Sequence, residues 1–82
     1  MKSEIFLRAI RNRNEIRFYY GTDEVFVQPY YITTDRHGNK ILYGKVRGSN
    51  EIKKFYYNLI SNIRVFINER FSPVIPIIPL AS

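Results

Sequence analysis

Two turn signals separated by a short alternating run constrain the fold of this chain more than any other feature. The turns at residues 35–39 and 47–50 both contain Gly and Asn, which tolerate the positive φ angles of hairpin turns. The run between them has a period of two, which predicts a strand with one face in a core. One parity holds Leu42, Gly44 and Val46, and the other holds Ile41, Tyr43 and Lys45. Residues 30–57 are therefore predicted to form an antiparallel meander of three strands.

A helix is predicted before the meander, over residues 3–13. Ser3 is a candidate N-cap because its hydroxyl can accept a hydrogen bond from a free helical N–H. Asn12 and Asn14 are expected to end the helix in the left-handed conformation. The apolar side chains recur at helical spacing: Ile5, Phe6, Ala9 and Ile10.

The remaining pattern predicts strands throughout. We expect strands at residues 15–20, 24–34, 41–46, 53–57 and 63–69, with a single helical turn at 58–62. Pro29 lacks an N–H, so the second strand should bend, bulge or run along an edge there. A helix and five short antiparallel strands predict a mainly β (α+β) fold. We expect a small five-stranded barrel of the SH3-like or Sm-like kind, closed at one end by the N-terminal helix.

The chain is predicted to divide into a barrel domain, residues 1–71, and a Pro-rich hydrophobic tail, residues 72–82. In the tail Pro73, Pro76 and Pro79 recur at every third position, the period of a polyproline II helix. Such an apolar segment is expected to pack on its own barrel or on a second copy, or to dock a partner.

Composition narrows the range of functions that this chain can have. The 82 residues include 13 Lys and Arg against 7 Asp and Glu, and the net charge of +6 indicates either a polyanion partner or an ordinary basic surface. Cys is absent and the one His, His37, lies in a predicted turn, so no metal site is expected. Without a nucleophile–base pair or a Gly-rich phosphate loop, we expect neither an enzyme nor a cofactor. We also expect no signal peptide and no membrane span.

Aromatic and basic residues alternate on the predicted outer faces of the strands. Bases of nucleic acid stack on aromatic rings while cations hold the phosphates, so these pairs are candidates for binding single strands. The alternative is that the same residues form a packing surface. The candidate binding residues are Arg17, Tyr19, Tyr43, Lys45, Arg47, Lys54, Tyr56 and Arg64.

Several segments also follow one another in a familiar order. They are residues 7–10 with 16–20, and then 27–32, 38–44, 54–63 and 69–71. In this order they resemble the WYL domain, an Sm-like barrel of bacterial transcriptional regulators and defence-associated proteins. Leu42 stands at the Leu of the Trp-Tyr-Leu triplet, and Lys40 and Ile41 replace its two aromatic residues. The resemblance implies an Sm-like barrel and a role in regulation through a bound ligand or nucleic acid.

We therefore expect a cytoplasmic, non-catalytic regulatory module that binds single-stranded nucleic acid or a nucleotide-like ligand. The alternative is a protein-interaction or assembly module that uses the same aromatic residues and binds no nucleic acid. Because small barrels retain an exposed strand edge, we also expect a homodimer through that edge and the Pro-rich tail.

Overall fold

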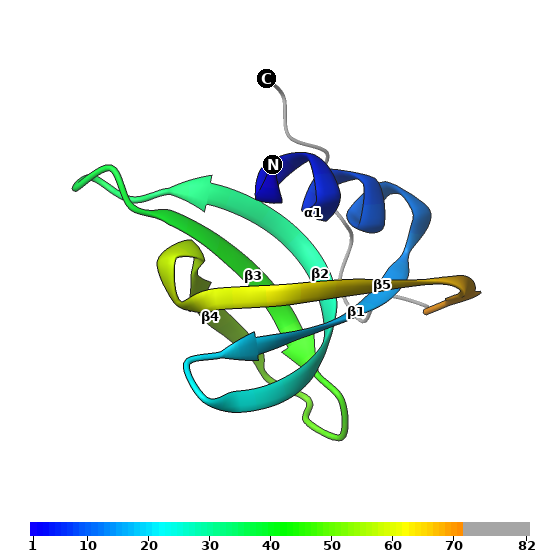
Figure 1. Ribbon diagram of the computed structural model, residues 1–82. Helices are drawn as coiled ribbons and strands as arrows, with labels where there is room; N and C mark the ends of the chain where they lie inside the picture. The colour runs from blue at the N-terminus through cyan, green and yellow to red at the C-terminus, as the bar shows by residue number, and fades with distance from the viewer. Residues whose placement is uncertain (72–82) are drawn as a thin grey trace.

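The computed structural model describes residues 1–71, with Glu69 placed by its backbone alone (Figure 1). The Pro-rich tail predicted at residues 72–82 lies outside this part of the chain. In chain order the elements are α1 (Lys2–Asn12), β1 (Asn14–Tyr20), β2 (Asp23–Thr34), β3 (Lys40–Val46), β4 (Ile52–Tyr56), the 3-10 turn η1 (Tyr57–Leu59) and β5 (Ile60–Arg70).

The five strands form one antiparallel sheet in the order β4-β3-β2-β1-β5. The prediction of a mainly β fold with an N-terminal helix is confirmed. β4 and β5 each have a single neighbour among the described strands, so closure of the sheet into a barrel is not confirmed. In Figure 1 the sheet curls strongly, and α1 lies across one end of the curl.

Side chains from α1 and from the inner face of the sheet meet in one core. The helix contributes Phe6, Ala9 and Ile10, of which none is more than 5% exposed. Burying each large apolar side chain contributes about 1.5–3 kcal/mol. The sheet contributes Ile16, Phe18, Val27, Ile32, Leu42, Phe55 and Ile60.

A tyrosine on β1 connects this strand to the edge strand β4 through a hydrogen bond and a ring contact. The Tyr20 hydroxyl accepts a hydrogen bond from the backbone N–H of Tyr56 at 3.1 Å. The ring of Tyr20 also meets Phe55 edge to face, with ring centres 5.1 Å apart, and Phe18 meets Phe55 at 5.3 Å. Since β1 and β4 are not neighbours in the sheet, these contacts stabilise its curl.

β2 contains a bulge at Pro29, one of the three outcomes that the sequence predicted. The register with β3 shifts by one residue between Pro29 and Tyr31, so Tyr30 is the extra residue. The ladder between β1 and β2 extends only to Val27, so at Pro29 the strand is paired on one side. The missing N–H of Pro29 therefore interrupts no hydrogen bond to β1.

The start of α1 differs from the prediction. Met1, not Ser3, occupies the N-cap position, and no side chain caps this end of the helix. The Ser3 hydroxyl instead lies 3.1 Å from the Tyr57 hydroxyl. The side chain predicted to cap the helix therefore bonds to η1 instead.

The end of α1 also differs. Arg13 adopts the left-handed conformation (φ 55°) and its N–H bonds to the last turn of the helix, whereas Asn12 and Asn14 were predicted to do so. Asn14 is 2% exposed and begins β1. Its place in the sheet requires the chain to reverse one residue earlier, at Arg13.

The helical turn after β4 is shorter than predicted. It covers Tyr57–Leu59, and β5 begins at Ile60 instead of residue 63. Ile60 pairs with Tyr20 and is 2% exposed, so burial in the core favours the strand at this position. The turn places the ring of Tyr57 edge to face with Phe6, at 5.2 Å.

The alternation of the last strand sets Ile63, Val65 and Ile67 on one face, opposite Arg64, Phe66 and Asn68, and only part of that face is buried. Ile63 and Val65 pack against the core, but Ile67 is 73% exposed. The β1–β5 register shifts between Ile16↔Val65 and Asn14↔Arg70, so β5 leaves the ladder at residues 66–69. No helix within residues 1–71 has the length and apolar character that crossing a bilayer requires.

Candidate functional site

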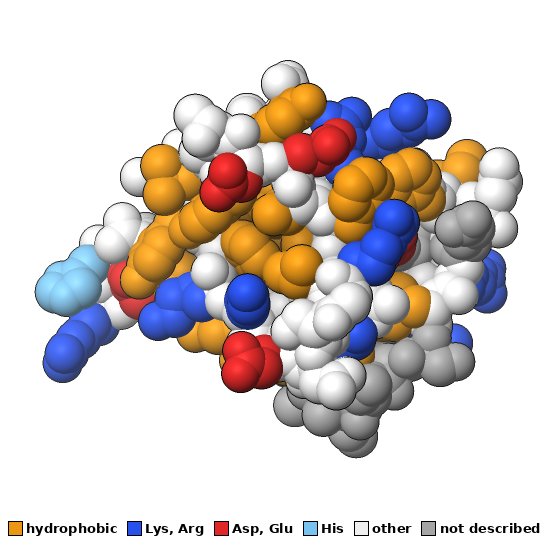
Figure 2. Space-filling model, turned by 90° about the horizontal axis from the view of Figure 1, so that it is seen from below, with side chains coloured by type: hydrophobic (Ala, Val, Ile, Leu, Met, Phe, Trp, Pro, Cys, Tyr) orange, Lys and Arg blue, Asp and Glu red, His pale blue; other side chains and the backbone are white. Residues whose placement is uncertain are grey.

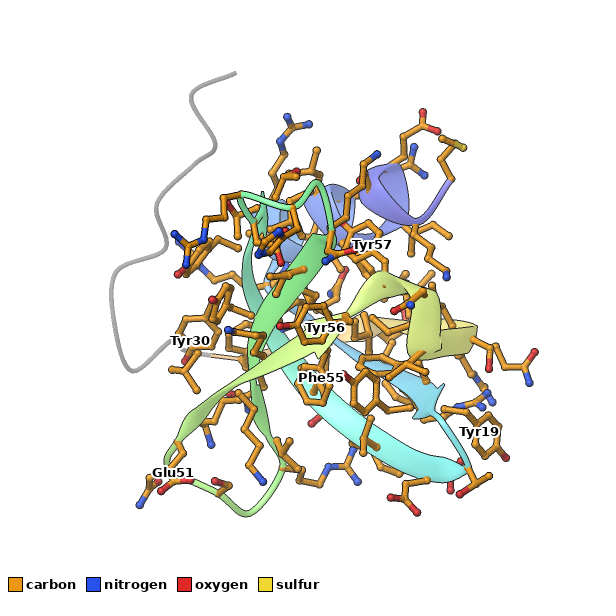
Figure 3. All side chains as sticks on the ribbon, turned by 90° about the vertical axis from the view of Figure 1, so that its left-hand side faces the viewer. Tyr19, Tyr30, Glu51, Phe55, Tyr56 and Tyr57 are labelled. Atoms are coloured by element: carbon orange, nitrogen blue, oxygen red, sulfur yellow. The ribbon has the colours of Figure 1, made fainter. Side chains whose placement is uncertain are left out.

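The eight residues predicted to bind a ligand lie in two separate groups. Tyr43 and Lys45 on β3 lie beside Lys54 and Tyr56 on β4. Arg17 and Tyr19 on β1 lie beside Arg64 on β5. Arg47, in the turn after β3, belongs to the same group, because its backbone N–H donates a hydrogen bond to the carbonyl of Phe26 on β2. In Figure 3 Tyr19 lies well apart from Tyr56, so the curled sheet does not bring the two groups into one site.

The first group extends across three strands in a single row. Tyr31 on β2 is opposite Tyr43 on β3, which is opposite Lys54 on β4. The rings of Tyr31 and Tyr43 are stacked, with centres 4.7 Å apart and planes 15° from parallel. Lys54 Nζ lies 5.9 Å from the centre of the Tyr56 ring. We name this surface the β2–β4 platform: Tyr31, Tyr43, Lys45, Lys54 and Tyr56.

A buried aliphatic residue lies on the outward side of β3 next to the platform. Ile41 has the outward parity of β3, yet it is 2% exposed and lies between Thr33 and Tyr56 in the register. Burial on the outward side means that neighbouring side chains cover this position. Tyr56, which is directly opposite Ile41, therefore lies beside a packed position, which limits its side-chain freedom.

The platform is basic. The outward positions of β3 and β4 hold Ile41, Tyr43, Lys45, Ile52, Lys54 and Tyr56, with no carboxylate among them. Lys45 Nζ donates to the backbone oxygen of Ser49 at 2.8 Å, which fixes that side chain near the β3–β4 turn and leaves its charge in place. Figure 2, which views the molecule from below, shows basic side chains lying among hydrophobic ones on that face, with some acidic side chains beside them.

Two of the three arginines in the second group have carboxylate partners. Arg47 donates two hydrogen bonds to the carboxylate of Glu15, and its Cζ lies 4.2 Å from the centre of the Phe26 ring. Arg17 Nε lies 3.8 Å from a carboxylate oxygen of Glu24. On average, the arginines of this group are therefore more nearly neutralised by carboxylates than the lysines of the platform are.

Sequence reasoning missed two aromatic contacts of the outer face. Tyr31 shares the parity of the inward residue Val27 and so was not a candidate, but the bulge at Tyr30 turns it outward. Phe26 and Phe66 lie on strands separated by β1, and their rings stack with centres 6.0 Å apart. For these two contacts, the only sign in the sequence was Pro29, which indicated that β2 could be irregular near Tyr31.

The side chains of the platform suit the binding of a ligand. Within residues 1–71, no three His, Cys, Asp or Glu side chains come together as metal ligands. The platform offers ring faces and ammonium groups, which suit stacking and ionic contacts with a planar anionic ligand. No protein-family model, curated protein or solved structure matches this chain.

Proposed function

We propose that this chain is a non-catalytic regulatory module that binds single-stranded nucleic acid, or a nucleotide-like ligand, on the β2–β4 platform. The resemblance to WYL domains supports a regulatory role, and it extends the proposal to a small Sm-like barrel. The observation that carries the proposal is the row Tyr31–Tyr43–Lys54, which crosses three strands and ends beside Tyr56.

Each part of the row has a role in this proposal. The half-buried rings of Tyr43 and Tyr56 stack on bases through their accessible faces, and each stacked base contributes about 1–3 kcal/mol. Lys54 and Lys45 contact the phosphates on either side of a stacked base. Because every base has a π face, binding of this kind depends little on sequence.

The decisive experiment compares two adjacent lysines. Lys54 is on the platform, whereas Lys53 is opposite Gly44 and has the opposite parity. Lys54→Gln and Lys53→Gln remove the same charge, so any loss from net charge alone is equal in the two variants. Fluorescence anisotropy with labelled oligo-dT and oligo-U of about 12 nucleotides covers the site size of a small barrel. We expect K54Q to weaken binding clearly more than K53Q.

Salt dependence provides the second readout. Two lysine–phosphate contacts predict a log–log slope of affinity against salt of about −1.4, and K54Q should lower it by about 0.7. Equal losses for K53Q and K54Q, or no binding of either oligonucleotide by the wild type at low salt, would contradict the proposal.

A second candidate function, assembly without nucleic-acid binding, is favoured by the edge strand β5. Ile67 on β5 is 73% exposed and Ile5 on α1 is 37% exposed, and a hollow of about 170 Å³ separates these elements. Both β4 and β5 also present an unpaired strand edge in the described sheet, and such edges can pair with a second copy. We propose a homodimer through this edge and the tail as the alternative.

Sedimentation velocity separates the two candidates. An apolar interface between copies of charge +6 should strengthen as salt rises, whereas binding to phosphates weakens. We expect Ile67→Ser and removal of residues 72–82 each to shift a dimer toward monomer. A monomer across the micromolar range for the wild type would contradict the assembly candidate.

A further inference from the structure

Two arginines face each other on the outer side of β1 and β5. Arg17 is directly opposite Arg64 in the antiparallel register. Side chains at such positions have Cβ atoms about 4.5–5.5 Å apart, and like charges there destabilise a sheet. Opposed like charges cost stability, and an anion bound by both guanidinium groups would offset that cost.

Each guanidinium lies against an aromatic ring of its own strand. Arg17 Cζ is 5.5 Å from the centre of the Tyr19 ring, and Arg64 Cζ is 5.6 Å from the centre of the Phe66 ring. A ring contacts the flat face of a guanidinium and leaves the N–H edge available as a donor. The rings thus limit the freedom of both arginines without using their donors.

Carboxylates neutralise this pair only in part. The distance of 3.8 Å between Arg17 Nε and Glu24 exceeds a hydrogen bond, and the Glu24 side chain is 48% exposed. Within residues 1–71 the guanidinium of Arg64 has no hydrogen bond or ion pair, and its one contact of this kind is with the ring of Phe66. Arg47, by contrast, has the carboxylate of Glu15 as a two-bond partner.

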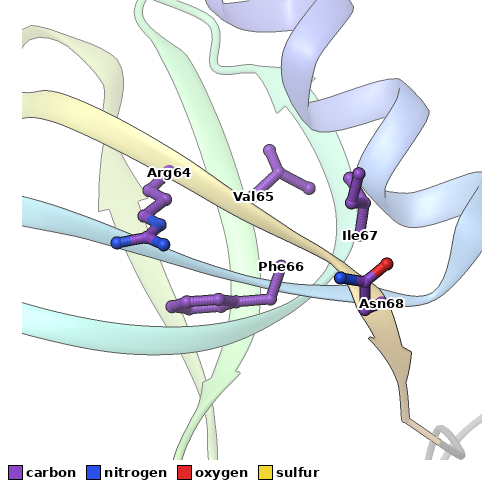
Figure 4. A pocket seen from close by; sticks show the side chains of 5 residues that line it. All are labelled: Arg64, Val65, Phe66, Ile67 and Asn68. Atoms are coloured by element: carbon purple, nitrogen blue, oxygen red, sulfur yellow. The ribbon is translucent and has the colours of Figure 1, made fainter.

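A hollow of about 260 Å³ adjoins Arg64 on β5 (Figure 4). Figure 4 shows Arg64 and Phe66 projecting to one side of the strand, and Val65 and Ile67 to the other. Asn68 also lines the hollow and adds an amide that can donate to an anion. All five lining residues belong to β5, so Arg64 is the arginine of the pair that borders the hollow. An oxyanion that reaches its guanidinium approaches from the side of the strand on which Arg64 and Phe66 project.

We propose that Arg17 and Arg64 form a clamp for a phosphate group, separate from the β2–β4 platform. Guanidinium groups bind phosphate through paired N–H donors, and an anion between the arginines removes their repulsion. The phosphate belongs either to a small phosphorylated molecule or to the terminal phosphate of a nucleic-acid strand. The two sources present the same chemistry to the clamp.

Thermal unfolding with pyrophosphate tests the clamp at constant ionic strength. At ten times Kd, pyrophosphate should raise the Tm of the wild type by about 6–11 °C relative to chloride. Arg64→Gln and Arg17→Gln should each abolish most of this rise. Arg36→Gln, in the exposed β2–β3 turn, removes the same charge and should keep it. In chloride, R64Q should be at least as stable as the wild type, because it relieves the repulsion.

A second measurement identifies the source of the phosphate. Labelled oligo-dT with a 5′-phosphate should bind the wild type more tightly than the unphosphorylated strand if the clamp holds a strand end, and R64Q should remove the difference. If pyrophosphate stabilises the wild type but the two strands bind alike, the clamp serves a small phosphorylated molecule. Equal Tm rises in wild type and R64Q, or no rise in either, would overturn the clamp. Because oligonucleotide binding through Lys54 is measured separately, failure of the clamp and failure of the platform are distinguishable.

Discussion

Gly44→Ala should destabilise the protein through a steric conflict between β2 and β3. Gly44 is buried on the inner parity of β3, and a Cβ built there would lie 2.5 Å from Cγ1 of Val27. It would also lie 2.7 Å from the backbone oxygen of Gln28. A side chain can rotate away, but the carbonyl of Gln28 belongs to the neighbouring strand, so the strands must separate.

The magnitude follows from two opposing effects. Overpacking of this kind costs about 1–3 kcal/mol. Replacing Gly by Ala also restricts the unfolded chain, which returns about 0.4–1 kcal/mol where the native φ suits Ala. Gly44 is not among the residues with positive φ, so this term applies. The two effects together leave about 0–2.6 kcal/mol. Because the Gln28 carbonyl cannot rotate away, we expect a net loss of about 1–2 kcal/mol within this range, which lowers Tm by about 4–16 °C.

Urea unfolding followed by far-ultraviolet circular dichroism measures the loss. Val27→Ala removes one of the two contacts, so the pair G44A and V27A should show a coupling energy of at least about 0.5 kcal/mol. Gly48 is the matched control, because it has positive φ (82°) and open space around it. G48A should lose stability without coupling to Val27. A change below about 0.3 kcal/mol for G44A, or no coupling to V27A, would refute the close approach of β2 to β3.

Two further predictions concern the curl of the sheet and the β2–β3 turn. Tyr20→Phe keeps the ring but removes the acceptor of the Tyr56 N–H, and urea unfolding should show a loss of about 0.5–1.5 kcal/mol, whereas an unchanged stability would contradict a role for this bond in the curl. Hydrogen bonds from the backbone N–H groups of Asn39 and His37 hold the pKa of Asp35 below its ordinary value of 3.8, so its carboxylate stabilises the fold above that pH and this contribution is lost as the pH falls through the lower folded pKa. Asp35→Asn should therefore flatten the acid side of the stability–pH profile, and an unchanged slope there would contradict the assignment.

The order and kind of elements could be predicted because the signals are local. Alternating residues and turn residues determine which segments can form strands, and the inward residues Leu42, Val27 and Phe55 follow from that period. An irregularity at Pro29 was also predictable, as a bend, a bulge or an edge position, and the structure shows the bulge. The ends of α1 were not, because the N-cap and C-cap depend on what lies next to the helix.

The candidate site was less predictable, because its geometry depends on register. An extra residue at Tyr30 reverses the parity that follows it, and thereby turns Tyr31 onto the outer face. A register shift also explains Ile67, which is exposed because β5 leaves the ladder with β1 at residues 66–69. Parity alone also cannot show that the candidate residues divide into two groups, since that depends on the order of strands in the sheet.

The most direct test of the platform is an NMR titration of the isotopically labelled chain with unphosphorylated oligo-dT at low salt. Bases that stack on tyrosine rings shift the ring resonances, so the largest changes should fall on Tyr31, Tyr43 and Tyr56, with the side chain of Lys54 following them. Raising the salt should reverse these shifts. Shifts centred on Tyr19, or no shifts at low salt, would contradict binding on the β2–β4 platform.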